Sequence, residues 1–371
     1  MTQATTTPRG ASPARPSDTL PDETLLRWLH DMQLIRDFEA RTMQMYQQAK
    51  IGGFCHIYSG QEASAVGCTA AVNHDDPIVL AYRDHGHALA RGMHPAACMA
   101  EMFGKLSGCA KGKGGSMHMF DKPNWLFGGH GIVSAQNPLG TGLAFAARDQ
   151  WEVLGSGPKK VALTFLGDGA LDQGALHEAQ NLASLFGLPV IYVLENNGYS
   201  MGTALHRHTA NSENLLDRAK GYGMKAISFD GLDIRNVYDN MKPLVDECRD
   251  LQRPAFVDMK TYRYQGHSMS DPQKYRSKEE VESFKERDSI ANLAAYLMKP
   301  TEEGGRGCLT EDEWKAMQKE IRQTVLDAVE YASNAPDPDP ATELATDTYA
   351  YPIRNLSPSE HYSHGAKNPL L

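Results

Sequence analysis

Several common patterns are absent from this sequence of 371 residues, and each absence excludes a class of protein. No apolar run approaches the about 18 residues that a membrane-spanning helix requires, so we expect no membrane association. The net charge of −9 argues against a nucleic-acid-binding surface, because such surfaces are usually basic. The six cysteines include no C-x-x-C pair, which argues against a metal role and favours reduced thiols in a cytosol-like compartment.

The glycines also fail to form two familiar nucleotide-binding motifs. A dinucleotide fingerprint requires G-x-G-x-x-G, and Gly167, Gly169 and Gly174 are spaced differently. A Walker phosphate loop requires G-x-x-x-x-G-K-[ST], and the stretch from Gly108 to Lys113 is one residue short of it. The sequence therefore favours neither a nicotinamide enzyme nor a simple nucleotide hydrolase.

A strand–helix–strand unit is present near the middle of the chain. Val161 to Leu166 and Leu188 to Glu195 are short apolar runs, as expected for buried parallel strands of an α/β fold. Gly187 ends the helix between them. Because the carboxyl ends of parallel strands meet at one sheet edge, Asp168 and Asn197 should both lie where ligands bind. The apolar residues at helical spacing are Ala175, Leu176, Ala179, Leu182, Ala183 and Phe186.

The residue types at this edge suit magnesium and a diphosphate. Asp168 and Asn197 offer the hard oxygen ligands that magnesium prefers, and magnesium takes its other ligands from phosphates and water. Gly169 lets the backbone approach an anion, and a helix start near Asp172 adds free N–H groups. The alternative is a simple turn with a capping aspartate, but the matching Asn-Asn pair after the next strand argues against it.

The two ends of the chain differ in composition from its centre. Residues 1–21 are rich in Thr, Ser, Pro and Ala and should be disordered, as a bacterial extension more than an organelle transit peptide. An α/β domain should span 22–334, with helices on both faces of a mostly parallel sheet. It should begin with a helix from Asp22 to about Lys50 and end with one opened by a capping box at Thr310. Residues 335–371, rich in Pro and acids, should form an extended tail.

Five longer segments, together with Gly-Asp-Gly and Asn-Asn, make the chain resemble one enzyme family from about Leu25 to Ala332. The resemblance is to the alpha subunits of the decarboxylating first enzyme of the 2-oxo acid dehydrogenase complexes, with the pyruvate type as the nearest match. The segments are GFCHIYSGQEA from Gly53, AYRDHGHALARG from Ala81, CAKGKGGSMHMF from Cys109, GGHGIVSAQNPLGTG from Gly128 and TYRYQGHSMSDP from Thr261.

The resemblance implies a thiamine diphosphate-binding fold whose cofactors are thiamine diphosphate and magnesium. Arg83 would donate to the diphosphate, and Val133 would hold the cofactor in a bent form that brings its amino group towards the thiazolium carbon. The implied cofactor residues are Tyr82, Arg83, Gly131, Val133, Asp168, Gly169, Ala170, Asn197 and His267, and the implied metal ligands are Asp168, Asn197 and Tyr199, the last through its backbone carbonyl.

The same resemblance implies catalytic roles for two histidines, His56 and His267. Imidazoles there would donate to a developing alkoxide or carboxylate, or move protons near neutral pH. His130 lies beside the cofactor segment, and the sequence leaves its role open. The implied reaction is decarboxylation of pyruvate followed by oxidative transfer of the two-carbon fragment to a lipoyl group on a transacetylase.

The resemblance also implies a partner subunit, because the residue that activates the cofactor is expected on another chain. In this family the glutamate that activates the cofactor comes from a separate beta subunit, and we do not assign that role to Glu62. The chain should be inactive alone and act in a tetramer of two alpha and two beta chains, in the bacterial cytoplasm or, as the less favoured alternative, the mitochondrial matrix. Acetoin or a branched 2-oxo acid is the alternative substrate, and a non-catalytic assembly subunit is the third hypothesis.

A few positions depart from the family pattern. Ser134 and Asn137 stand where Gly and Val are expected, and Gln265 where His or Arg is more usual. The first two follow the cofactor segment, so they bear on cofactor affinity or on the substrate pocket. Ser268 and Ser270 match positions that are phosphorylated in mitochondrial relatives, and kinase regulation is not expected in a bacterial chain.

Overall fold

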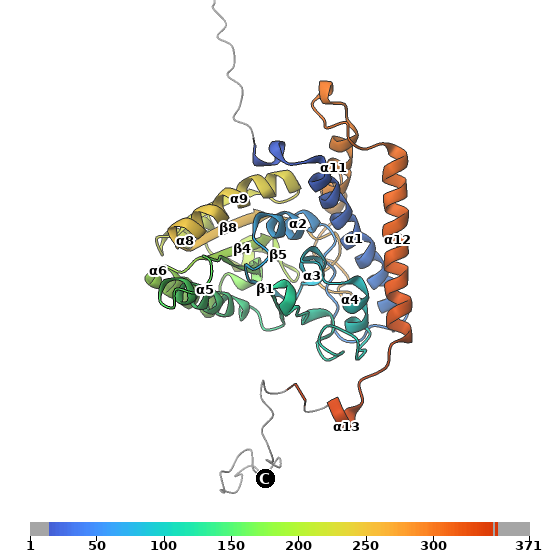
Figure 1. Ribbon diagram of the computed structural model, residues 1–371, viewed down its shortest axis with the longest axis horizontal. Helices are drawn as coiled ribbons and strands as arrows, with labels where there is room; N and C mark the ends of the chain where they lie inside the picture. Colours follow the sequence, from blue (N-terminus) through green and yellow to red (C-terminus); the bar gives the residue numbers. More distant parts are fainter. Residues whose placement is uncertain (1–14, 344–345, 348–371) are drawn as a thin grey trace, which may run out of the picture.

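The computed structural model describes residues 15–343 and 346–347, and its centre is a six-stranded sheet in which every pair of neighbours is parallel (Figure 1). The strand order is β2-β1-β3-β4-β8-β7. The expected α/β class with a parallel sheet is confirmed. The strands are β1 Ile78–Ala81, β2 Leu126–His130, β3 Ala162–Gly167, β4 Val190–Asn196, β7 Lys225–Asp230 and β8 Ala255–Lys260, and a separate antiparallel pair is β5 Tyr199–Ser200 with β6 Thr203–Ala204.

Helices cover both faces of the sheet, because the apolar side chains of β4 point alternately to one face and to the other. Ile191 and Val193 pack into one hydrophobic core with α2 and α9, whereas Tyr192 and Leu194 pack into a second core with α5, α6 and α8. Successive side chains of a strand point to opposite faces, so a strand buried on both faces reads as one continuous apolar run. These helices are α2 Glu62–Ala71, α5 Gln136–Glu152, α6 Gly174–Phe186, α8 Leu216–Lys220 and α9 Ile234–Leu251.

A second group of helices stands beside the sheet, at the right of Figure 1. Its two long members, α1 Asp22–Gln47 and α12 Glu311–Asn334, pack along each other. The first ends three residues before the expected Lys50, because Ala49 adopts a left-handed conformation with φ of 58°. The capping box of the second is confirmed: the Thr310 N–H donates to the Glu313 carboxylate over 2.8 Å. The remaining members are α3 His85–Ala90, α4 Pro95–Met102 and α11 Ser289–Met298, while α10 Lys278–Lys285 packs through Phe284 against Tyr262.

The expected disordered extension is wrong for the seven residues that precede α1 and that the structure describes. Pro16–Thr19 form a 3-10 helix, and the buried Ser17 donates from its N–H to the Asp239 carboxylate over 2.7 Å. The polar composition does not prevent order here because a residue from a distant helix supplies the hydrogen bonds. Residues 1–14 of the proposed extension lie outside the described residues.

The described part of the C-terminal tail is not wholly extended. It contains the short helix α13 Pro340–Glu343, and Asp337 and Asp347 form ion pairs with Lys105 and Lys113. The rest of the tail, 344–345 and 348–371, lies outside the described residues.

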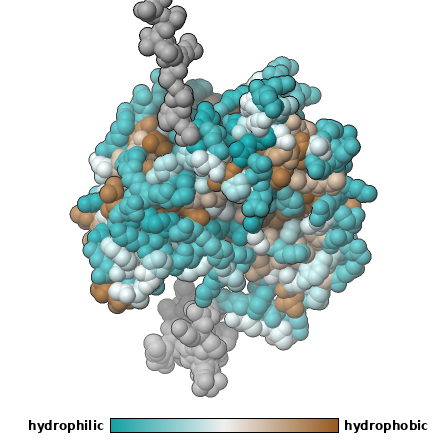
Figure 2. All heavy atoms as spheres, turned by 45° about the horizontal axis from the view of Figure 1, so that its top comes forward, coloured by the Kyte–Doolittle hydropathy of each residue, from teal (hydrophilic) through white to brown (hydrophobic). Residues whose placement is uncertain are grey.

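None of the helices that the structure describes is long and apolar enough to cross a membrane. On the face seen in Figure 2, hydrophobic residues form separate small groups within a mainly hydrophilic surface.

Candidate active site at the carboxyl edge of the sheet

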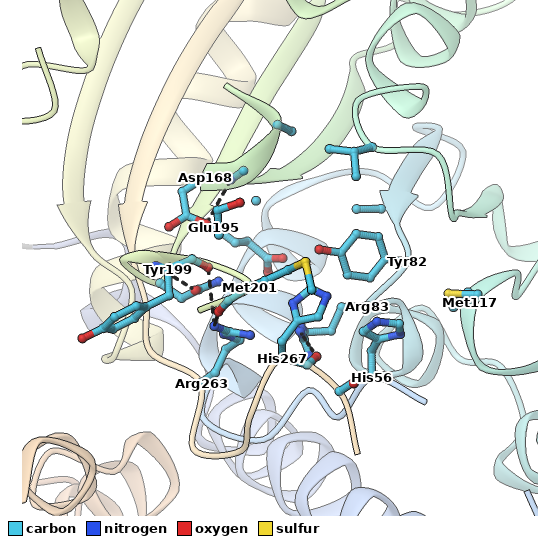
Figure 3. Close-up of a pocket in the computed structure, with 18 of the residues that line it drawn as sticks. His56, Tyr82, Arg83, Met117, Asp168, Glu195, Tyr199, Met201, Arg263 and His267 are labelled. Carbon is cyan, nitrogen blue, oxygen red and sulfur yellow. Dashed lines mark hydrogen bonds between the residues drawn. The ribbon is translucent and has the colours of Figure 1, made fainter. Parts of the chain in front are cut away.

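A cavity of about 800 Å³ opens beside the carboxyl ends of β1, β3 and β4 (Figure 3). β3 and β4 pair in parallel, with Gly167 opposite Glu195, so the segments that follow them enter the same cavity. The structure brings all the candidate residues together here: His56, Tyr82, Arg83, Gly131, Val133, Asp168, Gly169, Ala170, Asn197, Tyr199 and His267 all line the cavity.

Asp168 has the properties of a cation ligand. Its side chain is almost fully buried, with 2% of the residue exposed. Oδ1 accepts a hydrogen bond from the Gly169 N–H over 3.1 Å, whereas the buried Oδ2 has no partner among the described residues. Burial raises the pKa of this carboxyl, against the opposing influence of the Arg263 charge. A buried carboxylate oxygen without a donor is costly, and a bound cation would remove that cost.

The two asparagines after β4 have different surroundings. Asn196 is buried, donates to Asp258 over 2.9 Å and accepts from the Gly198 N–H, so it holds the turn. Asn197 lines the cavity, and its Oδ1 accepts from the Tyr199 N–H over 3.4 Å. Gly198 has a φ of 82°, which brings the Tyr199 backbone round to the same side.

This donor set fits magnesium better than a transition metal. No group of three or more His, Cys, Asp or Glu side chains is placed to hold a metal in the part of the chain that the structure describes. Magnesium needs only one or two carboxylates, since phosphates and water complete its shell. The expected helix start near Asp172 is wrong by two residues, because a 3-10 turn intervenes and α6 begins at Gly174.

Arg83 and Arg263 bring two positive charges into the cavity. Both are buried, and burial lowers the pKa of Arg83 to about 10, so it stays charged near neutral pH. The terminal nitrogens of Arg83 donate to the backbone carbonyls of Ile57 and His267 over 2.6 and 2.7 Å, which leaves each one further N–H. Arg83 was expected from the sequence, and Arg263 was not. Arg263 donates to the Met201 carbonyl over 3.0 Å, and its Nε and Nη1 have no partner among the described residues.

The guanidinium of Arg263 is buried, and two of its nitrogens have no partner among the described residues. It is therefore well placed to receive an anion. A signal for it existed in the sequence, since Arg263 lies in the TYRYQGH segment three residues after β8 ends.

His56, Tyr82 and His267 form a cluster of rings on one wall. The His56 ring centroid lies 4.6 Å from that of Tyr82 and 5.2 Å from that of His267. Burial, reinforced by the Arg83 charge, lowers the pKa of His56 to about 2 and that of His267 to about 4. Both imidazoles are thus neutral at physiological pH. This suits them to the hydrogen-bonding role that the resemblance implies more than to proton transfer near neutral pH.

The sequence analysis also missed Glu195 and His87. Glu195 lines the cavity, accepts a hydrogen bond from Ser64 over 2.7 Å and another from the Tyr58 phenol, and burial raises its pKa to about 7. His87 is buried next to it, with Nε2 at 3.6 Å from the carboxylate. The signal was the acid at the end of an apolar strand, directly before Asn-Asn.

Of the other residues named in the sequence, His130, Glu62 and Gln265 do not line the cavity, whereas Ser268 and Ser270 do. His130 hydrogen-bonds the Leu80 carbonyl over 3.1 Å and is not among the residues that line the cavity. Glu62 is held by Arg36 over 2.9 Å and by the Gly60 N–H, also away from the cavity wall. Gln265 accepts from Arg276 through its backbone carbonyl. Ser268 and Ser270 do line the cavity, with their hydroxyl oxygens 3.1 Å apart.

Fold and site together define a class: a parallel α/β protein with a large cavity at the carboxyl edge of its sheet, lined by a buried carboxylate and two buried guanidinium groups. Comparison with known sequences then gives the family, since the model of the Dehydrogenase E1 component family matches residues 30–341. The chain belongs to this family, which depends on thiamine diphosphate, and its sheet and helices are those of a thiamine diphosphate-binding fold.

Relatives from several organisms agree with this assignment. The chain is 46% identical over 323 residues to "Pyruvate dehydrogenase E1 component subunit alpha" of Rhizobium meliloti, which covers 87% of this chain and 89% of that protein. It is 43% identical over 327 residues to the protein of that name from Rickettsia bellii, covering 88% and 96%. The chloroplastic alpha-3 subunit of Oryza sativa is 38% identical over 333 residues, covering 89% and 76%. The resemblance found in the sequence is thereby confirmed.

Proposed function

We propose that this chain is the alpha subunit of a pyruvate dehydrogenase E1 component. It would decarboxylate pyruvate with thiamine diphosphate and magnesium, and pass the acetyl group to a lipoyl-bearing transacetylase. The names of its relatives support pyruvate as the substrate. The observation that carries the cofactor assignment is the buried Oδ2 of Asp168, which has no partner among the described residues and lies at the edge between two parallel strands.

In this proposal the magnesium ligands are Asp168, the Asn197 side chain and the Tyr199 backbone carbonyl. Gly169 and Ala170 would offer backbone groups to the diphosphate, and Arg83 would neutralise part of its charge together with Arg263. The cofactor supplies the electron sink that makes loss of carbon dioxide possible. The protein residues bind it, orient it and exclude water.

The aminopyrimidine end of the cofactor would lie against Gly131 and Val133. Both line the cavity, and the Val133 side chain is partly exposed, so it can pack against a ring. Tyr82 would contact the cofactor beside His56 and His267. As neutral imidazoles, these two would hydrogen-bond the carboxylate or carbonyl oxygen of pyruvate.

The proposal includes partners and a compartment. The beta subunit would provide the acid that activates the cofactor, so the chain by itself should show no turnover, and the active form would be a tetramer of two alpha and two beta chains. The bacterial relatives support the cytoplasm as its location.

The test is turnover by the affinity-tagged chain with the proteins that copurify from its native cell. Thiamine diphosphate, magnesium and an artificial electron acceptor would be supplied, with pyruvate, branched 2-oxo acids and acetoin offered in parallel. Preference for pyruvate, dependent on a copurifying chain of beta-subunit size, is the expected result. Preference for another substrate would move the function to a sister enzyme, and no turnover with bound cofactor and partner would support an assembly role.

Replacing Asp168 tests the cation site directly. Asp168→Ala should abolish magnesium-dependent cofactor binding, measured by calorimetry on the copurified complex. Asp217→Ala, which removes a carboxylate from an exposed ion pair with Lys220, is the matched control and should bind as the wild type does. Retained magnesium-dependent binding in Asp168→Ala would refute the assignment.

A further inference from the structure

The segment that carries two of the proposed metal ligands is a short turn, residues 197–202, which we call the metal loop. It is held from two sides by residues far away in the chain. On the cavity side, Arg263 donates to the backbone carbonyls of Tyr199 and Met201 over 3.4 and 3.0 Å (Figure 3). The contacts on the other side are made by the Tyr199 side chain.

The Tyr199 phenol points away from the cavity centre in Figure 3. Its hydroxyl donates to the carboxylate of Glu280, with oxygen–oxygen distances of 2.9 and 3.1 Å. Its ring lies against Tyr275, with centroids 5.2 Å apart. The backbone carbonyl and the side chain of this one residue therefore have separate contacts, the carbonyl accepting from Arg263 on the cavity side and the phenol fastening the loop on the other.

Glu280 is itself fixed in position. It lies in the first turn of α10, where its N–H donates to the Ser277 hydroxyl over 3.1 Å. Its carboxylate accepts a second phenol, that of Tyr262, over 2.8 Å. The Tyr262 ring is stacked on Phe284 with centroids 3.8 Å apart, so the acceptor cannot easily move with the loop.

We propose that Glu280 is a positioning residue for the metal site: through the Tyr199 phenol it sets the Tyr199 carbonyl where magnesium needs it. This inference rests on the proposed cation site. Magnesium demands near-ideal octahedral geometry at about 2.0–2.1 Å, whereas calcium tolerates more ligands at varied distances. Loosening the metal loop should therefore weaken the binding of magnesium more than that of calcium.

The test is Glu280→Gln in the full complex, with the affinity for each cation measured by calorimetry at a fixed, saturating thiamine diphosphate concentration. A neutral amide keeps the shape but loses the charge-assisted hydrogen bonds from two phenols. The dissociation constant for magnesium should rise about tenfold, equivalent to about 1.4 kcal/mol, and that for calcium less than threefold. Turnover lost at low magnesium should return as magnesium is raised.

Two further variants keep the test decisive. Glu282→Gln makes the same charge change at an exposed position of the same helix and should not alter either affinity. Tyr199→Phe removes only the phenol hydroxyl, so it should reproduce the magnesium effect. Because both changes act on the same Tyr199–Glu280 hydrogen bond, their effects on magnesium affinity should be much less than additive in the combined variant.

The outcomes separate this inference from the proposed function. If the wild-type complex binds the cofactor without any cation, both fail. If the wild type requires magnesium and Glu280→Gln binds magnesium like Glu282→Gln, the inference alone is wrong. Equal losses for magnesium and calcium, or a lower melting temperature with unchanged cation affinity, would mean that Glu280 only stabilises the fold and would also overturn it.

Discussion

Ser134 occupies a backbone position that suits glycine, with a φ of 75° and its side chain fully buried. Its hydroxyl oxygen accepts a hydrogen bond from Asn137 Nδ2 over 2.8 Å. Asn137 Oδ1 lies 3.3 Å from the Thr164 hydroxyl, which can donate to it. The two departures from the family pattern are therefore one unit, because a serine at the glycine position needs a donor and the asparagine provides it.

This pairing predicts that Asn137→Val changes protein stability in opposite directions depending on whether residue 134 is serine or glycine. Asn137→Val should destabilise the wild type by about 1–2 kcal/mol, because it removes the donor to Ser134. In a Ser134→Gly background the same change should stabilise, because it removes an unsatisfied buried amide. Urea unfolding of the four variants measures this, and additive effects would show that the two positions are independent.

His87 is a buried neutral base whose Nδ1 has no partner among the described residues. Burial lowers its pKa to about 3, whereas an unfolded histidine titrates near about 6.5. Between these values the unfolded chain binds a proton that the folded chain does not. Stability from this group is therefore present above about pH 6.5 and is lost as the pH falls.

His87→Gln removes the titrating group and with it this dependence of stability on pH. Relative to the variant, the wild type should lose about 2 kcal/mol of unfolding free energy between pH 7 and pH 5. Urea titrations at the two pH values give the difference. The exposed His206→Gln is the control and should follow the wild type at both. A wild-type advantage that grew on acidification would contradict the assigned direction.

At the scale of elements, the glycine-rich loop 108–115 resembles a phosphate-binding loop in sequence but binds a different group. Its backbone amides bind an anion of the protein itself. Glu101, fully buried on α4, accepts hydrogen bonds from the N–H groups of Ala110, Gly112, Gly114 and Gly115 over 2.7–3.0 Å. Gly108 passes so close to Glu101 that a Cβ there would clash with its backbone.

Glu101→Gln should therefore loosen this loop. An amide oxygen cannot replace a carboxylate that accepts four hydrogen bonds, and its NH₂ group would face other donors. Trypsin should then cleave after Lys111 or Lys113 at least tenfold faster than in the wild type, as followed by mass spectrometry. Glu178→Gln, at an exposed position of α6, is the control. Equal cleavage rates in the two variants would refute this role for Glu101.

At the scale of the whole molecule, one helical face stands out as apolar and exposed. We define the α5–α6 face by Leu139 and Phe145 of α5 with Leu182, Leu185 and Phe186 of α6, which are 45–70% exposed. Phe145 and Phe186 meet edge to face at 6.1 Å. Contiguous exposed apolar residues usually mark an association surface. Such a face suits a subunit of a larger assembly.

A charge placed on the α5–α6 face should disturb assembly without disturbing the fold. Phe145→Glu should reduce the fraction of assembled complex severalfold, because the charge would be buried without a partner. Sedimentation velocity of the copurified complex measures this fraction. Leu251→Glu, an exposed leucine on α9, is the control. Normal assembly of Phe145→Glu would show that this face is not part of the interface.

The sequence by itself determined the α/β class, the strand–helix–strand unit at the site and the family. Local patterns suffice for these, since a strand buried on both faces must be apolar throughout and a helix must show its own period. They also placed Asp168 and Asn197 at one edge, because parallel strands end together. The resemblance to the family added most of the other candidates, and all eleven line one cavity.

Only the tertiary structure decided the electrostatics and the supports of the site. Glu195 meets Tyr58 across 137 positions, and Glu280 meets Tyr199 across 81. The two Arg263 nitrogens without a partner in the described part of the chain, and the low pKa of His267, likewise depend on burial by distant segments. The physical reason is that desolvation and hydrogen bonding depend on every group within a few ångströms, and the order of residues along the chain does not specify those neighbours.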